Sequence, residues 1–121
     1  MLNLDTHMII ALLRGDLRGK EQRLIETANQ LLISDIVNWE LAKLVQLGRL
    51  ELDLESRAYR VFSSTLTMVP ITTEIALAST RLDFESDPAD EIIAATSVVE
   101  SIPLLTRDEK ILASRQVPFP E

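Results

Sequence analysis

The sequence contains no cysteine and only one histidine, His7. Without cysteine, the chain cannot form disulfides, thiolate zinc sites or a cysteine nucleophile. A single histidine also excludes a multi-histidine zinc site within one chain. Aromatic residues make up only 4% of the chain although 46% of it is hydrophobic, so the core must be built from aliphatic side chains. Chemistry in this protein must therefore depend mainly on oxygen-bearing side chains.

No segment approaches the ~20 consecutive apolar residues that a membrane span requires. The start of the chain, Met1–Asp5, has no basic region and meets a charge at once, so it does not resemble a signal peptide. We expect a soluble cytoplasmic protein without a membrane partner. Its 121 residues predict one domain, residues 1–121, that is long enough to bury a core.

The formal net charge of −7 argues against a protein that holds nucleic acid by bulk electrostatic attraction. It leaves open a protein that uses bound cations and a local basic edge for that purpose.

Apolar runs and turn signals predict strands that alternate with helices. The expected strands are Leu2–Leu4, Leu31–Ile33, Leu66–Val69 and Leu104–Leu105, with a further edge strand at Val117. The expected helices cover residues 7–13, 21–28, 36–47, 54–63, 72–81, 88–101 and 108–113. In the helix 54–63 we expect Leu54, Ala58, Val61 and Phe62 to face inward. The alternation predicts an α/β fold with a mainly parallel sheet of four to five strands and helices on both faces.

The stretch from Asp87 to Asp108 organises this prediction. Asp87 suits a helix N-cap, and Pro88 suits the first helical position. Asp90 then falls in the first turn, where the helix dipole favours a carboxylate. The short strand Leu104–Leu105 ends at the polar residues 106–108. Chemistry in an open α/β sheet gathers at the carboxyl ends of the strands, where we expect both Asp90 and Asp108 to lie.

Four acidic residues are predicted to meet at this edge of the sheet: Asp5, Glu40, Asp90 and Asp108. Carboxylates this close together would repel one another and resist ionisation, unless a divalent cation lay between them. An all-oxygen ligand set suits Mg²⁺ or Mn²⁺. Such a cation can polarise a phosphodiester and supply the attacking hydroxide. Metal-assisted hydrolysis therefore fits the residue inventory better than a covalent route.

Each of these acids also has a simpler structural explanation when it is taken alone. Asp5 and Asp108 suit helix caps, and Asp90 suits the first turn of a helix. Glu40 lies at the margin of an apolar helix face and, alone, would most often be solvated. His7 lies close to Asp5 in the sequence, but metal-assisted hydrolysis does not need it, and we expect a structural role for it.

Four short motifs occur in the order seen in a known family. They are Leu4-Asp5-Thr6-His7; Ser34 with Glu40 and Lys43; Asp87-Pro88-Ala89-Asp90 followed by Ile92–Thr96; and Leu105-Thr106-Arg107-Asp108. Over essentially its whole length the chain resembles PIN-domain ribonucleases, specifically the VapC-type toxins of type II toxin–antitoxin pairs. It departs from the family at Glu91, where relatives often carry arginine, and this adds negative charge beside the predicted pocket.

The resemblance implies a three-layer α/β/α sandwich that cleaves RNA with Mg²⁺, with Mn²⁺ as a possible substitute. It also implies a homodimer that is inhibited by a small antitoxin, in a higher hetero-oligomer where the two assemble. Asp5 and Asp90 would be the main metal ligands, with Glu40 and Asp108 completing the pocket partly through water. The residues implied to be catalytic are Asp5, Glu40, Asp90 and Asp108, and the metal set is Asp5, Asp90 and Asp108. Thr6 and Thr106 would support these groups from behind.

Basic residues that could contact RNA occur in two places. Arg107 and Lys110 flank Asp108 and would lie near the predicted metal. Arg14 begins the densest basic cluster, residues 14–23, which is equally typical of a solvated surface. Trp39, next to Glu40, has no aromatic neighbour in sequence, so a packing or interface role suits it better than base stacking.

Two other functions compete with the nuclease hypothesis. A receiver-like signalling module is similarly small and acidic, but it needs two adjacent acids after the first strand and an Asp at the end of the third. Here Thr6 follows Asp5, and Pro70 follows Val69. A catalytically inactive PIN-fold scaffold would keep the fold only to bind a partner, and absence of Mg²⁺ affinity would favour it.

Overall fold

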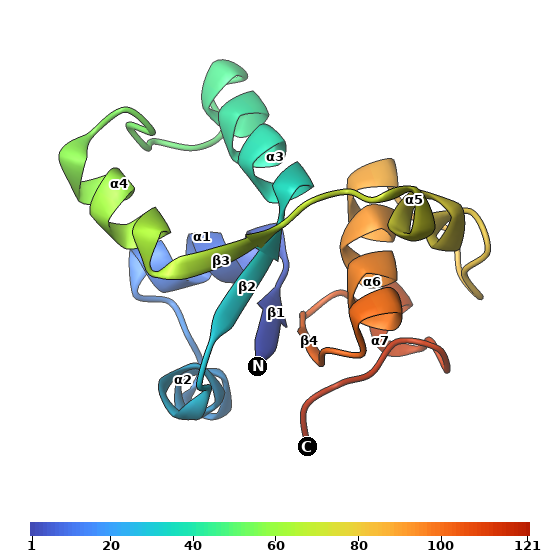
Figure 1. Ribbon diagram of the computed structural model, residues 1–121. Helices are drawn as coiled ribbons and strands as arrows, with labels where there is room; N and C mark the ends of the chain where they lie inside the picture. The colour runs from blue at the N-terminus through green and yellow to red at the C-terminus, as the bar shows by residue number, and fades with distance from the viewer.

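The computed structural model describes residues 1–121 and is built on one four-stranded, fully parallel sheet (Figure 1). The strands are β1 (Leu2–Leu4), β2 (Leu31–Ser34), β3 (Leu66–Val69) and β4 (Leu104–Leu105), in the spatial order β3-β2-β1-β4. The helices are α1 (Thr6–Arg14), α2 (Gly19–Thr27), α3 (Asp35–Gln46), α4 (Arg57–Ser64), α5 (Thr73–Ser79), α6 (Pro88–Glu100) and α7 (Glu109–Leu112). The predicted α/β class and the parallel sheet are confirmed.

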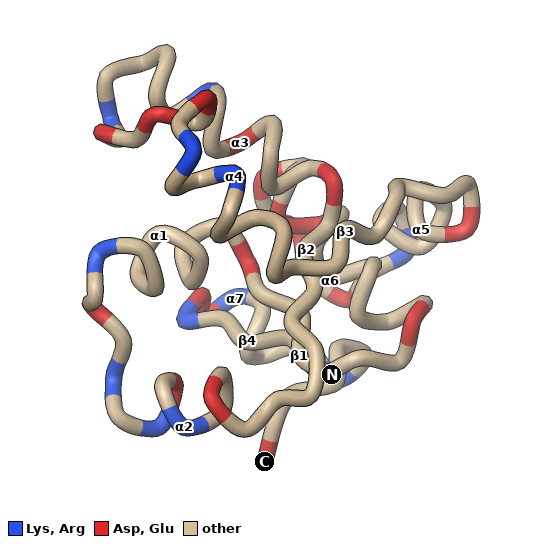
Figure 2. The backbone as a smooth tube through the Cα atoms, turned by 60° about the vertical axis from the view of Figure 1, so that its left-hand side comes forward, with Lys and Arg blue, Asp and Glu red and all other residues tan.

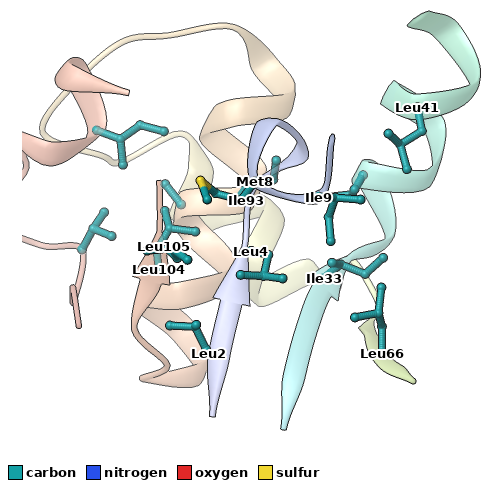
Figure 3. Packing of buried hydrophobic residues seen from close by; sticks show 14 of the residues in the cluster. Leu2, Leu4, Met8, Ile9, Ile33, Leu41, Leu66, Ile93, Leu104 and Leu105 are labelled. Carbon is teal, nitrogen blue, oxygen red and sulfur yellow. The ribbon is translucent and has the colours of Figure 1, made fainter. Parts of the chain in front are cut away.

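Successive strand residues point to opposite faces of the sheet, and each face has its own apolar cluster. Leu32 packs with Val69, Ile75 and Ala95 beneath α5 and α6. On the other face, the neighbouring Ile33 belongs to a larger aliphatic cluster. Figure 3 shows members of that cluster, with Leu2 and Leu4 of β1 between Leu104 and Leu105 on one side and Ile33 on the other. As expected from the scarcity of aromatic residues, aliphatic side chains make up most of the core.

Asn3 is a polar exception in the middle of the central strand β1, with only 1% of its surface exposed. Its side chain points toward α6, where Nδ2 donates to the carbonyl oxygen of Ile93 at 3.3 Å and to Oγ of Ser97 at 2.9 Å. Its Oδ1 is buried without a hydrogen-bond partner. A pair of hydrogen bonds therefore ties the centre of the sheet to the middle of α6.

Two local predictions are wrong. Helix α4 begins at Arg57 rather than Leu54, because the hydroxyl of Ser56 caps it by accepting from Tyr59 N at 3.1 Å. Leu54 and Phe62 pack against the core as predicted. Tyr59 is buried with them, whereas Val61 is 58% exposed and Ala58 is exposed as well.

The second error concerns Val117, which forms no strand although its side chain is buried. The C-terminal segment instead runs beside β4, where Leu104 N donates to the carbonyl oxygen of Pro118 at 2.9 Å. None of the helices is long and apolar enough to cross a membrane.

Ile33 provides a test of the packing on the larger face of the sheet. Its side chain is fully buried in the central strand β2. Ile33→Ala should lower the free energy of unfolding by about 3 kcal/mol, because it removes buried methyl groups and leaves a cavity. Urea denaturation followed by circular dichroism measures this change. Val61→Ala, on an exposed helix face, should stay within about 0.5 kcal/mol of the wild type, and an equal loss in both variants would contradict this packing.

Candidate active site

The register of the sheet brings Asp5 and Thr106 together at the carboxyl ends of β1 and β4. Leu4 pairs with Leu105, so the residues that follow them leave the sheet side by side. The Thr106 hydroxyl donates to Oδ2 of Asp5 at 2.5 Å, and Met8 N donates to Oδ1 at 2.8 Å. Asp5 is thus the N-cap of α1 and is only 4% exposed. Burial raises the pKa of its carboxyl group above the ordinary value of 3.8, although these hydrogen bonds oppose the shift.

Glu40 approaches the same edge from α3, which begins directly after β2. The hydroxyl of Thr6 donates a hydrogen bond to Oε1 of Glu40. Burial raises the pKa of Glu40, and repulsion from Asp90 and Asp5 adds to the rise. Thr6, which is itself buried, therefore holds the third helix's carboxylate beside that of Asp5.

Asp90 and Asp108 come from the C-terminal half of the chain. Asp90 lies in the first turn of α6 and accepts from the Ser86 hydroxyl at 3.2 Å. Burial raises its pKa, and the charges of Asp108 and Asp5 raise it further. Asp108 caps α7, since its Oδ1 accepts from Lys110 N at 2.8 Å. Its backbone N–H donates to Thr106 Oγ1 at 3.0 Å, which links it to Asp5 through one hydroxyl.

A cavity of about 190 Å³ joins these groups, and its lining contains no hydrophobic residue. The residues that line it are Asp5, His7, Asp90, Arg107 and Asp108. A wider depression, which Lys110 helps to line, shares Asp90 and Asp108 with this cavity. Three of the four predicted acids thus line one cavity. Glu40 does not line it, but its carboxylate interacts electrostatically with those of Asp90 and Asp5.

Arg14 does not line this cavity. It is exposed at the end of α1, at the start of a row of basic positions that continues into α2 (Figure 2). Arg107, in contrast, lines the cavity, and its guanidinium group is paired with Glu21 of α2. Of the three basic residues predicted to contact RNA, two therefore lie at the acidic edge and one lies apart from it.

The structural role expected of His7 stays a prediction, although the residue lies at the cavity, and Glu21 was not predicted from the sequence. His7 is exposed and lines the cavity. Burial still raises the pKa of Asp5 and of Glu40, and His7 opposes part of that rise. Its place two residues after Asp5 was visible in the sequence. Glu21 pairs with a residue 86 positions away, and nothing in its local sequence pointed to that partner.

The donor set suits a hard divalent cation, because every acidic side chain here offers only oxygen. The raised pKa values of Asp5, Glu40 and Asp90 agree, since an added positive charge would favour their ionised forms. In the present geometry, however, no three His, Cys, Asp or Glu side chains are close enough together to hold a metal ion directly. Magnesium usually keeps several waters in proteins, so one or two direct carboxylates with the others acting through water fit this arrangement.

Comparison with known proteins identifies relatives of the whole domain. The PIN domain family pattern matches residues 3–115. A toxin-antitoxin complex from Klebsiella pneumoniae contains a chain that is 25% identical, with a TM-score of 0.72 over 93% of this chain and 91% of that one. No curated protein sequence matches the chain.

Two further solved structures share the fold at lower identity. VapBC2 from Rickettsia felis, bound to a DNA fragment from its promoter, is 16% identical, with a TM-score of 0.75 over 99% of this chain and 98% of that one. FitAcB from Neisseria gonorrhoeae is 22% identical, with a TM-score of 0.69 over 99% and 97%. A receiver-like module receives no support from any of these matches.

The buried charge of Asp5 should make the metal-free protein less stable than an uncharged variant. A raised folded-state pKa means that the ionised carboxylate costs free energy above that pKa and nothing below the ordinary value of 3.8. Asn caps helices as well as Asp does, so Asp5→Asn should increase the free energy of unfolding at pH 7 in EDTA. Urea denaturation from pH 7 down to pH 4 should show this gain shrinking as the wild-type carboxylate takes up its proton.

The matched control for that experiment is Asp35→Asn. Asp35 is exposed in the first turn of α3, and its substitution should change stability by no more than about 0.5 kcal/mol. A loss of stability in Asp5→Asn at pH 7 would mean that the carboxylate is a net stabilising group, contrary to the burial described here.

Proposed function

Since the chain belongs to the PIN domain family, we propose that it is a Mg²⁺-dependent endoribonuclease and the toxin of a toxin–antitoxin pair. The observation that carries the proposal is the meeting of four carboxylates from separate elements at one edge of the sheet. Burial opposes the ionisation of Asp5, Glu40 and Asp90, and a bound cation would relieve this cost. The similarity to a chain of a toxin-antitoxin complex supports the biological setting.

Asp5, Asp90 and Asp108 would hold the cation, one or two of them directly and the others through water. We take this cation to be Mg²⁺, with Mn²⁺ as a substitute. Glu40 would complete the acidic set through water, since it does not line the cavity itself. When bound, such a cation supplies a polarised phosphodiester oxygen and a water of lowered pKa. The protein's contribution is to keep the carboxylates in place.

Hydrogen bonds already hold the catalytic carboxylates in position. Thr106 and Met8 N fix both oxygens of Asp5, and Thr6 fixes one oxygen of Glu40. Asp108 is held by the first turn of α7. Groups fixed in this way need little rearrangement when charge develops in the transition state, which is how preorganised sites lower barriers. Thr6 and Thr106 are therefore positioning residues in this proposal.

Two basic side chains at the acidic edge are suited to bind the RNA backbone. Arg107 lines the cavity itself, and Lys110 lines the depression beside it. Arg14 lies farther away in the exposed basic row of α1 and α2, and we assign it to a more distant part of a long RNA (Figure 2). Local basic groups of this kind offset the overall negative charge, which would otherwise repel RNA.

The partners in this proposal are a small antitoxin and a second copy of the chain. Solved relatives are complexes of toxin with antitoxin, which supports the first. For the second, Trp39 is 56% exposed on α3 and Met68 is 42% exposed on the edge strand β3. Asn38 Nδ2 lies 3.3 Å from the sulfur of Met68, so these exposed apolar groups belong to adjoining elements. Exposed apolar side chains on adjoining elements favour a protein interface, and we infer a homodimer that joins the antitoxin in a larger hetero-oligomer.

An inactive PIN-fold scaffold is the second candidate. One observation favours it, namely that no three metal-binding side chains are close enough together for direct coordination. Calorimetry with Mg²⁺ separates the two functions, because a scaffold has no reason to bind the cation.

Cleavage of RNA by the purified protein should require a divalent cation and should stop in EDTA. Asp5→Asn and Asp90→Asn should each lower the rate by at least ~100-fold. Residues that only support a metal ligand cost up to about 100-fold when mutated, and a ligand itself should cost no less. A fluorescence-quenched RNA assay with added Mg²⁺ measures these rates.

Asp35→Asn removes an exposed carboxylate from α3 and serves as the matched control, with activity equal to wild type. Full cleavage by Asp5→Asn, or cleavage that survives EDTA, would contradict the metal-dependent mechanism.

A further inference from the structure

Glu21 and Arg107 form the one ion pair of the molecule, and it lies beside the acidic cavity. Nε of Arg107 donates to Oε2 of Glu21 at 2.8 Å, and Nη2 donates to Oε1 at 2.6 Å. Nη2 also donates to the carbonyl oxygen of Asp16 at 2.9 Å. Two parallel bonds between a guanidinium and a carboxylate fix direction as well as distance.

Glu21 is also held by the start of its own helix. It lies in the first turn of α2, where Oε1 accepts from Arg18 N at 2.8 Å, and only 7% of its surface is exposed. The hydrogen bond from Arg107 holds the pKa of Glu21 at about 2, so this carboxylate stays ionised at every physiological pH. The position of the guanidinium is therefore set by α2, an element that does not contribute to the acidic cavity.

The ion pair with Glu21 matters for the acidic cavity because of where Arg107 lies. Arg107 follows Thr106, which is bonded to Asp5, and precedes Asp108, and it lines the cavity with both acids. An arginine has five N–H donors. Three of them are committed to Glu21 and Asp16, and Nη1 makes no hydrogen bond. Asp5 already acts electrostatically on the guanidinium.

The partner of this arginine depends on Glu21. With Glu21 present, the guanidinium lies at the cavity wall. Without it, the carboxylates left beside the guanidinium are that of Asp16, which is exposed, and those that line the cavity. Arginine forms strong two-pronged bonds with carboxylates. A guanidinium bound there would occupy the oxygens that a divalent cation needs.

We propose that Glu21 is a positioning residue that keeps Arg107 from pairing with the carboxylates of the acidic cavity, so that they remain available to a divalent cation. This proposal rests on the proposed function, because it concerns the same cavity. It assigns no contact with substrate to Glu21. Arg107, held in this way, keeps the two N–H groups of Nη1 for a phosphate of the RNA.

A double-mutant cycle on Mn²⁺ binding tests the proposal. The four proteins are the wild type, Glu21→Gln, Arg107→Gln and the double variant, each stripped with EDTA and titrated with Mn²⁺ while electron paramagnetic resonance reports the free ion. With Arg107 present, Glu21→Gln should weaken Mn²⁺ binding by about 10-fold, as is usual for a residue that supports a metal site from behind. In the Arg107→Gln background the same substitution should have little effect.

The cycle separates this role from two simpler ones. A general electrostatic effect of Glu21 would weaken binding equally in both backgrounds, because distant charges act additively. A purely stabilising role would leave Mn²⁺ affinity unchanged while lowering thermal stability, which is measured on the same samples. Either result would overturn the proposal. Glu26→Gln, on the exposed face of the same helix, is the matched control and should bind Mn²⁺ as the wild type does.

Failure of the proposed function has a different signature. If the wild-type protein bound no Mn²⁺ at all, the nuclease assignment would fail and the role of Glu21 would fail with it. If the wild type binds Mn²⁺ and cleaves RNA but the cycle shows no coupling, only the role of Glu21 is wrong.

Discussion

The parallel pairing of β1 with β4 is the constraint on which the rest of the site depends. Residues near the two ends of the chain become neighbours because Leu4 pairs with Leu105, and the hydrogen bond from Thr106 to Asp5 follows directly from that register. A shift by one residue would turn Asp5 to the other face of the sheet. It would also remove the hydroxyl that connects Asp5 to Asp108. The fold and the acidic cavity therefore depend on the same strand register.

At this edge of the sheet, burial in the core disfavours charged side chains, whereas binding of a cation requires them. The core surrounds Asp5 almost completely, which strengthens its hydrogen bonds but penalises its charge. Asp90 and Glu40 share this penalty and add mutual repulsion. Neutral groups at these positions would avoid the penalty, so the charged groups make this edge less stable than it could be. Such a loss of stability is expected of the cation site proposed above.

Sequence reasoning succeeded where a local pattern reports on global structure. The alternation of short apolar runs and helices determined the parallel sheet, and parallel topology then brought Asp5, Asp90 and Asp108 to one cavity. It failed where a single side-chain contact decided the outcome. The Ser56 cap moved the start of α4, and the pairing of Glu21 with Arg107 spans 86 residues and leaves no periodic trace.

Asn3 does not line the acidic cavity, yet it influences the geometry of that cavity. The two strand residues from Asn3 to Asp5 advance about 6.6 Å along β1. The two partners of Asn3 on α6 are centred on Ala95. Asp90 lies five residues before Ala95, which corresponds to about 7.5 Å along the helix axis toward its N-terminus. Since α6 runs antiparallel to β1 (Figure 1), both acids end at nearly the same height. One amide in the interior of the protein thus helps to fix the axial alignment of helix against strand, and with it the relative height of two of the acids.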